Sequence, residues 1–173
     1  MNNEAGLDAF VVAAYEAHHA EVFAFLALAT RDRRRAEELL RETFLALTAD
    51  AEARLRPSQV RGSLYRIAST LVVAPSQPAR LHWPSRRRRV DRGRSVASTP
   101  DDRGLAGPTT DTQRALDGLS VDARVALLLS AEGYAGNDIA TAIGRPTSAT
   151  RTLLCLARTR VRVRRRLFAA DDR

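Results

Sequence analysis

Apolar residues recur at helical spacing in three segments of the N-terminal part of the chain. Residues 7–29, 33–50 and 57–73 carry them every three or four positions, which predicts amphipathic helices with one buried face. Asp32 is a typical N-cap for the second helix, and Pro75 would end the third. The positions expected to face the core are Leu7, Phe10, Val11, Ala14, Val22, Phe25 and Leu26, then Ala36, Leu39, Leu40, Phe44 and Leu47, then Leu64, Ile67, Ala68 and Leu71.

Residues 74–110 have no repeating apolar pattern. They contain five of the seven Pro residues, three Gly residues and the run Arg86–Arg89. A segment of this length without periodicity is too long for a loop inside a compact domain, so we interpret it as a linker. The run Arg86–Arg89 fits equally well a nonspecific contact with nucleic acid and a solvated stretch of charge.

Helical spacing returns after the linker, with residues typical of helix ends. Ser120 is a candidate N-cap for an apolar helix that stops near Gly133. A short helix follows and ends at Gly144, and Pro146 then opens a long basic helix. A short helix, a glycine turn and a longer basic helix are typical of a helix-turn-helix.

The pattern predicts an all-α fold. We expect two small helical domains, residues 7–73 and 111–167, joined by a flexible linker over residues 74–110 that is rich in Pro and Arg. The helix-turn-helix would lie in the second domain, with Ile139, Ala140 and Ile143 packed inward.

The start of the long helix would present polar and basic side chains to the major groove of DNA. These are Thr147, Ser148, Arg151 and Thr152, and Arg158 would continue the basic face toward the phosphates. In an alternative that stays open, Leu153, Leu154 and Leu156 pack this helix inward and its Arg residues only keep it soluble.

Charge is distributed unevenly along the chain. All 28 basic residues are Arg, and the net charge is +8. Residues 51–115 carry thirteen Arg and five acids, residues 145–173 carry nine Arg and two acids, and the remaining two segments are net negative. Two basic blocks suggest two contacts with a polyanion, for which nucleic acid is the commonest candidate. A general replacement of Lys by Arg explains the missing Lys but not this segregation.

The sequence offers little for other kinds of function. One Cys excludes an internal disulfide, and three His residues give few ligands for a zinc site. His18 and His19 point to different helix faces, and Cys155 fits a small core residue better than a redox centre. We therefore expect no catalytic residue, metal, cofactor or small-molecule substrate. An acidic N-terminal segment and the absence of a long apolar run predict a cytoplasmic protein.

Two separate motifs, one in each predicted domain, point to one family. AEELLRETFL at residues 36–45 and LYRIA at residues 64–68 resemble the AEDLVQETF and WLYRIARN segments of region 2 in bacterial RNA polymerase sigma factors of the extracytoplasmic-function type, group 4 of the sigma-70 family. LDGLS at residues 116–120 and the stretch over residues 133–144 resemble region 4 of the same family, together with Arg124, Thr150, Arg151, Ala157 and Arg158. The motifs occur in the family's order, with a linker between them.

The resemblance implies a role for each domain. Region 2 would dock on the clamp of core RNA polymerase and open the −10 promoter element, and region 4 would bind the flap and read the −35 element. The implied polymerase-binding residues are Glu37, Glu38, Arg41, Glu42 and Phe44, and Tyr65 and Arg66 join the DNA-binding set. Members of the family catalyse nothing themselves and use no cofactor. Many are restrained by an anti-sigma factor, which can hold them at the inner face of the membrane.

The sequence departs from the family pattern at several places. Arg41 replaces a usual Gln, and residues 62–63 are Gly-Ser where the family has Trp or Phe. Residues 69–75 are apolar and then broken, where the family has a basic helix that holds the flipped −10 base. Leu153 and Leu156 stand where basic residues are frequent. Two alternatives stay open: a helix-turn-helix regulator that does not use polymerase, and a decoy that occupies polymerase or an anti-sigma factor without opening promoters.

Overall fold

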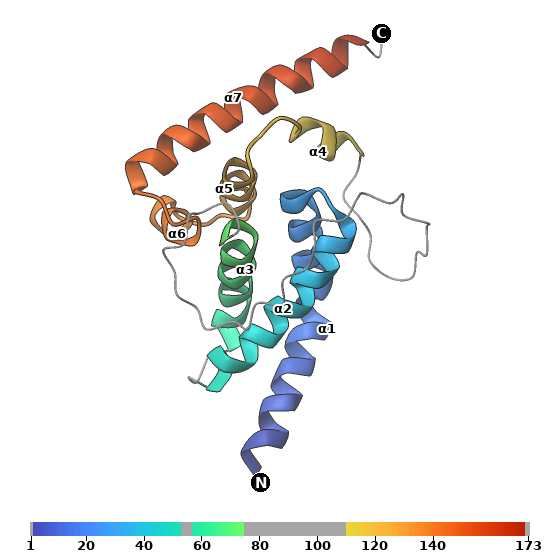
Figure 1. The fold of residues 1–173 in the computed structure, drawn as a ribbon, viewed down its shortest axis with the longest axis vertical. Helices are drawn as coiled ribbons and strands as arrows, with labels where there is room; N and C mark the ends of the chain where they lie inside the picture. Colours follow the sequence, from blue (N-terminus) through green and yellow to red (C-terminus); the bar gives the residue numbers. More distant parts are fainter. Residues whose placement is uncertain (1, 53–56, 75–109, 172–173) are drawn as a thin grey trace.

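The structure is a computed structural model that describes residues 2–52, 57–74 and 110–171. The described part of the chain contains seven α-helices, so the predicted all-α fold is confirmed (Figure 1). The linker predicted over residues 74–110, with its Arg86–Arg89 run, lies outside the described residues except at its two ends. The helices are α1 (Asn2–Thr30), α2 (Arg33–Glu52), α3 (Pro57–Val73), α4 (Thr110–Ala115), α5 (Val121–Ala131), α6 (Gly136–Ala142) and α7 (Thr147–Asp171).

Helices α1, α2 and α3 form the N-terminal half and pack around a common apolar core. All five residues of the stripe predicted for α2 are buried, as are Leu64, Ile67 and Ala68 of α3. The core also takes Phe23 and Ala29 of α1, which the predicted stripe omitted. Because α1 is covered by α2 on one side and by α3 and α5 on others, it buries more of its circumference than a single stripe.

The turn between α1 and α2 is set by residues close in sequence. Arg31 adopts a left-handed conformation with φ 61°, and its N–H donates to the carbonyl oxygen of Ala27 at 2.9 Å. Asp32 Oδ1 then accepts from the N–H of Arg35 at 3.1 Å, which confirms the predicted N-cap of α2. The chain reverses here, so that α1 and α2 lie side by side (Figure 1).

In the C-terminal half, α4 to α7, the predicted helix ends are also observed. Ser120 Oγ accepts from the N–H of Ala123 at 3.3 Å and caps α5. Gly144 has φ +64°, and the N–H of Arg145 reaches back to the carbonyl oxygen of Ala140 at 2.9 Å. This is the Schellman ending that a left-handed glycine permits, and it turns the chain from α6 into α7.

The long helix α7 has one face on the core and one in solvent. Leu154 and Ala157 are buried, whereas Leu156, Val163 and Leu167 are exposed. One face of α7 is therefore packed inward, as the alternative for this helix supposed. The opposite face exposes apolar and Arg side chains to solvent.

The two halves share one hydrophobic core. Val125 and Leu129 of α5 and Ile139 of α6 belong to the same buried cluster as Leu26 of α1 and Tyr65 of α3. Helix α5 contacts both α1 and α3, and α6 contacts α3 (Figure 1). The division into independent domains over residues 7–73 and 111–167 stays a prediction, and in this structure the two halves are packed together.

Helix α1 is the most apolar helix of the described chain by the membrane-span criterion. Its segment Ala9–Thr30 has a mean hydropathy of 1.2 and is long enough to cross a membrane by length and composition alone. About a third of this segment is buried in the protein, including Val22, Phe23 and Leu26 of the core.

Candidate functional site

The structure brings the predicted base-reading residues together at the start of α7. Thr147, Ser148, Arg151 and Thr152 are all exposed and lie within its first two turns. Thr150 faces the other way: it is buried, and its hydroxyl donates to the carbonyl oxygen of Pro146 at 3.1 Å. One face of the helix start is therefore fixed to the protein, and the opposite face is free to meet a partner.

An ion pair between a buried acid and an exposed Arg, which the sequence did not reveal, fixes the start of α7. Asp122 of α5 is 6% exposed, and Arg145, in the turn before α7, donates to its Oδ2 from Nε at 2.8 Å and also from Nη2. Such a charge-assisted, two-donor contact defines orientation as well as distance. It ties the start of α7 to α5.

Arg158, predicted to contact DNA phosphates, is hydrogen-bonded within the protein. Its Nη2 donates to Ser130 Oγ of α5 at 2.6 Å, although the side chain is exposed overall. It lines a groove of about 540 Å³ with Leu127, Val161 and three further Arg residues of α7. Its assignment to DNA stays a prediction, and contact with a phosphate would compete with the Ser130 bond.

The acidic face predicted to bind polymerase lies on α2, and its acids pair within their own helix. Arg35 Nη1 lies 3.0 Å from a Glu38 carboxylate oxygen and 3.6 Å from one of Glu42, and Arg33 Nε lies 3.3 Å from Glu37. These exposed pairs are weak and exchangeable. The acids therefore remain available to an external cation.

Two other residues of the docking motif differ sharply in exposure. Phe44 is buried, with its ring 5.0 Å from that of Tyr15, so it supports the helix from within. Arg41 is exposed, and beside it Leu45, which the prediction did not include, is 69% exposed. The outward face of α2 thus combines acids with one large apolar side chain.

Tyr65, assigned to DNA by resemblance, is buried between the two halves. It is 1% exposed, and its ring lies 5.1 Å from Phe25 and 5.8 Å from Tyr134. Tyr134 is placed there by Gly133, whose left-handed φ of +86° ends α5. Arg66, the next residue of the predicted set, is exposed. Contact of Tyr65 with DNA stays a prediction, and it requires this side chain to be uncovered.

Three charged residues from three helices meet above Tyr65. Arg61 of α3 lies 3.2 Å from Glu21 of α1, through Nε, and 2.5 Å from Glu132 at the end of α5, through Nη2. Its guanidinium carbon is 5.0 Å from the centre of the Tyr65 ring. The bond to Glu132 raises the pKa of Arg61, and burial raises the pKa of Tyr65. We call the contact among Glu21, Arg61 and Glu132 the Arg61 bridge.

A second polar contact joins the halves at the end of α1. Arg124 of α5 is buried, and it donates from Nε to the carbonyl oxygen of Ala29 at 2.8 Å and from Nη1 to that of Leu119 at 2.9 Å. Burial lowers its pKa. Nearby, Arg31 pairs with Asp117. Arg124 is the one basic residue between positions 116 and 144, and that isolation in an apolar helix was the available sequence signal.

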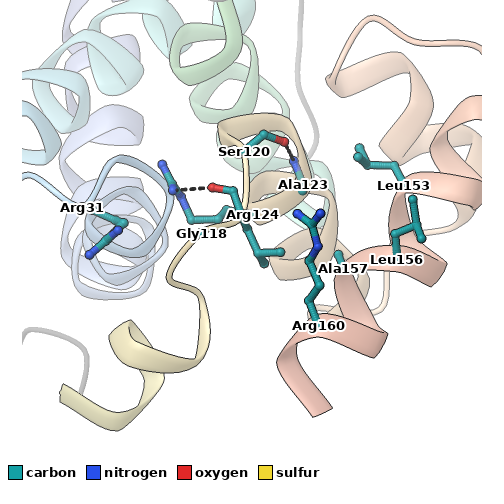
Figure 2. Close-up of a pocket in the computed structure, with 10 residues that line it drawn as sticks. Arg31, Gly118, Ser120, Ala123, Arg124, Leu153, Leu156, Ala157 and Arg160 are labelled. Carbon is teal, nitrogen blue, oxygen red and sulfur yellow. Dashed lines mark hydrogen bonds between the residues drawn. The ribbon is translucent and has the colours of Figure 1, made fainter. Parts of the chain in front are cut away.

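A cavity of about 490 Å³ lies beside this contact. Figure 2 shows Arg31, Arg124 and Arg160, from three different elements, around it, with Leu153 and Leu156 on the α7 side. None of the predicted polymerase-binding or DNA-binding residues lines it. It is therefore separate from the predicted base-reading residues of α7.

No cluster that could hold a metal is present among the described residues, which contain no group of three His, Cys, Asp or Glu side chains. His18 Nδ1 lies 2.6 Å from a Glu21 carboxylate oxygen, and His19 Nδ1 lies 2.9 Å from the carbonyl oxygen of Tyr15. Cys155 is exposed, so its predicted role as a small core residue is wrong.

Comparisons with known proteins identify a similar fold. No protein-family model matches the sequence, and no curated protein matches it. A solved structure that is similar is the sigma factor RpoE of Bartonella quintana in complex with the anti-sigma factor NepR. The TM-score is 0.56 at 21% identity, over 89% of this chain and 92% of that chain. The chain therefore has a sigma-factor-like fold over most of its length.

Proposed function

We propose that this protein is a sigma factor of the extracytoplasmic-function type, group 4 of the sigma-70 family, which binds core RNA polymerase and directs promoter-specific transcription initiation. One observation carries the proposal. In a sigma-factor-like fold, the start of α7 exposes Thr147, Ser148, Arg151 and Thr152, while the Arg145–Asp122 pair holds that helix on α5. A fixed helix with exposed polar and basic side chains is what base reading in the major groove requires.

The remaining parts of the site support this function. The acids of α2, with exposed Leu45, form the face that would dock on the polymerase clamp, and the C-terminal half would bind the flap and the −35 element. Tyr65 and Arg66 would contact the −10 element. The protein would act without catalysis or cofactor, in the cytoplasm. The similar RpoE was solved with an anti-sigma factor, which supports a partner of that kind here, able to hold the protein at the membrane.

Selection from a promoter library tests the proposal. Core polymerase loaded with the full chain should retain a defined subset of sequences, and Arg151→Ala should lose preference at one base position. Arg162→Ala is the matched control, because this Arg lies further along α7 and should weaken all sequences alike. Retention of the same random set with and without the protein contradicts the proposal.

One observation favours a second candidate, a sigma-like regulator or decoy that does not open promoters. Ser69, Val72 and Val73 at the end of α3 are buried, where the family pattern places a basic strand-opening helix. A regulator would select the same DNA without core polymerase. A decoy would bind polymerase or an anti-sigma factor and leave promoter DNA closed.

A further inference from the structure

The cavity of about 490 Å³ beside Arg124 is lined by two kinds of side chain. Its apolar wall comes from the segment that leads into α5, from the first turn of α5 and from α7, and consists of Leu119, Ala123, Leu153, Leu156 and Ala157. Its charged groups are the guanidiniums of Arg31, Arg124 and Arg160 (Figure 2). A cavity of this size with an apolar wall and a few polar groups is typical of sites for small organic ligands.

Positive charge is in excess at this cavity. No acid is among the described residues that line it, and the neighbouring Asp117 pairs with Arg31. A further cation, Arg164, lies against Gly118 of the lining, with its Nη atoms 3.6 Å from the position that a Cβ on this glycine would take. Burial lowers the pKa of Arg124 and Arg31 lowers it further, whereas Asp117 acts in the opposite direction. An anion held among these cations would relieve their mutual repulsion.

Three of these cations have N–H groups to spare. Arg160 has no hydrogen-bond or ion-pair partner among the described residues, and Figure 2 shows it extending from α7 toward the α5 side of the cavity. Arg164 Nη1 is buried and has no hydrogen-bond partner either. A buried donor without a partner is uncommon in native proteins, and a bound ion or ligand is one explanation of it. Arg124 uses two of its five N–H groups, on the carbonyl oxygens of Ala29 and Leu119.

A nucleotide fits this combination of an apolar wall and unused guanidinium donors. Guanidinium forks match the paired oxygens of phosphate groups, and several of them around one cavity favour a ligand with more than one negative charge. Apolar side chains and flat guanidinium faces accept a planar base, and a purine offers the larger surface for packing and stacking. A fatty acid would use the wall but brings a single charge, and inorganic phosphate would leave the wall unused.

We propose that this cavity binds a purine nucleoside diphosphate, with the phosphates between Arg31, Arg124 and Arg160 and the base against Leu153 and Leu156. The proposal goes beyond the proposed function and does not depend on it, because the cavity lies apart from the predicted base-reading and polymerase-binding residues. Binding is a property of the free chain and needs neither polymerase nor promoter.

Calorimetric titration of the full chain with GDP, and separately with ADP, tests the site. We expect saturable binding of a single nucleotide per chain, about tenfold tighter than that of guanosine, which lacks the phosphates, or of pyrophosphate, which lacks the base. Arg160→Ala should weaken GDP binding about tenfold, because it removes a hydrogen bond between charged groups. Arg162→Ala is the matched control, since it removes an exposed Arg of the same helix outside the cavity and should leave binding unchanged.

Leu156→Ala separates the contribution of the base from that of the phosphates. Leu156 is 58% exposed, so its truncation should leave the fold intact. It should weaken GDP binding about threefold, through lost apolar contact, and leave pyrophosphate binding unchanged. Circular dichroism checks that each variant keeps the helicity of the parent, and Arg160→Gln serves if Arg160→Ala lowers it.

Four results overturn the proposal. Failure of both nucleotides to bind at millimolar concentration excludes the ligand class, and an equal loss of binding with Arg162→Ala shows attraction to overall charge instead of to this cavity. Octanoate that binds as tightly as GDP shows a site for apolar carboxylates. Displacement of GDP by duplex DNA of random sequence assigns the cavity to a nucleic-acid surface.

Discussion

Removal of Arg145 should destabilise the protein more than removal of its partner Asp122. The side chain of Asp122 is 9% exposed, against 6% for the whole residue, and the side chain of Arg145 is 47% exposed. Breaking a fully buried ion pair lowers the free energy of unfolding by about 3–5 kcal/mol, and breaking an exposed pair lowers it by about 0–1 kcal/mol. Arg145→Ala leaves the carboxylate of Asp122 without its partner in a site that water can partly reach. We therefore expect an intermediate loss of about 2 kcal/mol. Asp122→Ala lets Arg145 turn to solvent and should cost about 1 kcal/mol, part of it from the lost acid in the first turn of α5.

Urea unfolding followed by helicity measures these free energies, and the double variant gives their coupling. The control for the helix-end effect is Asp111→Ala, which removes an exposed acid from the first turn of α4. Because the pair orients α7, Asp122→Ala should also weaken promoter binding severalfold while Arg145 itself is still present. Single effects that add within about 0.3–0.5 kcal/mol, with unchanged DNA affinity, would refute the reasoning.

Two further sets of substitutions test the two binding faces. Glu38→Arg with Glu42→Arg should abolish association with core polymerase at unchanged helicity. Glu16→Arg, a charge reversal at an exposed acid of α1, is the matched control. Equal co-purification of both variants with polymerase would contradict the docking face. Arg151→Ala should cost about 1–3 kcal/mol of binding to the selected promoter, whereas Arg162→Ala should lower binding to all sequences and flatten its salt dependence; equal sequence preference in all three proteins would remove Arg151 from the recognition surface.

Features that depend on neighbours in sequence were predictable. Asp32 and Ser120 cap the helices expected of them, and Gly144 ends α6 in a left-handed conformation, because each acts on backbone groups within a few residues. The stripe of α2 was likewise readable, since one face of that helix meets the core.

Features that join distant residues were not predictable. Arg124 binds the carbonyl oxygen of Ala29, and Arg61 binds Glu132, across separations that no local pattern encodes. Tyr65 was assigned to DNA from a motif alone, and a motif does not show that another part of the chain covers it. The exposed cluster at the start of α7 was predictable in composition, but its anchoring through Asp122 came only from the fold.

Run-off transcription with purified core polymerase tests the central claim most directly. Templates from the selected promoters should give transcripts of defined length with the full chain, none with core polymerase alone, and fewer with Glu38→Arg/Glu42→Arg. Binding of both polymerase and promoter without any defined transcript would contradict the assignment as a sigma factor and favour the decoy.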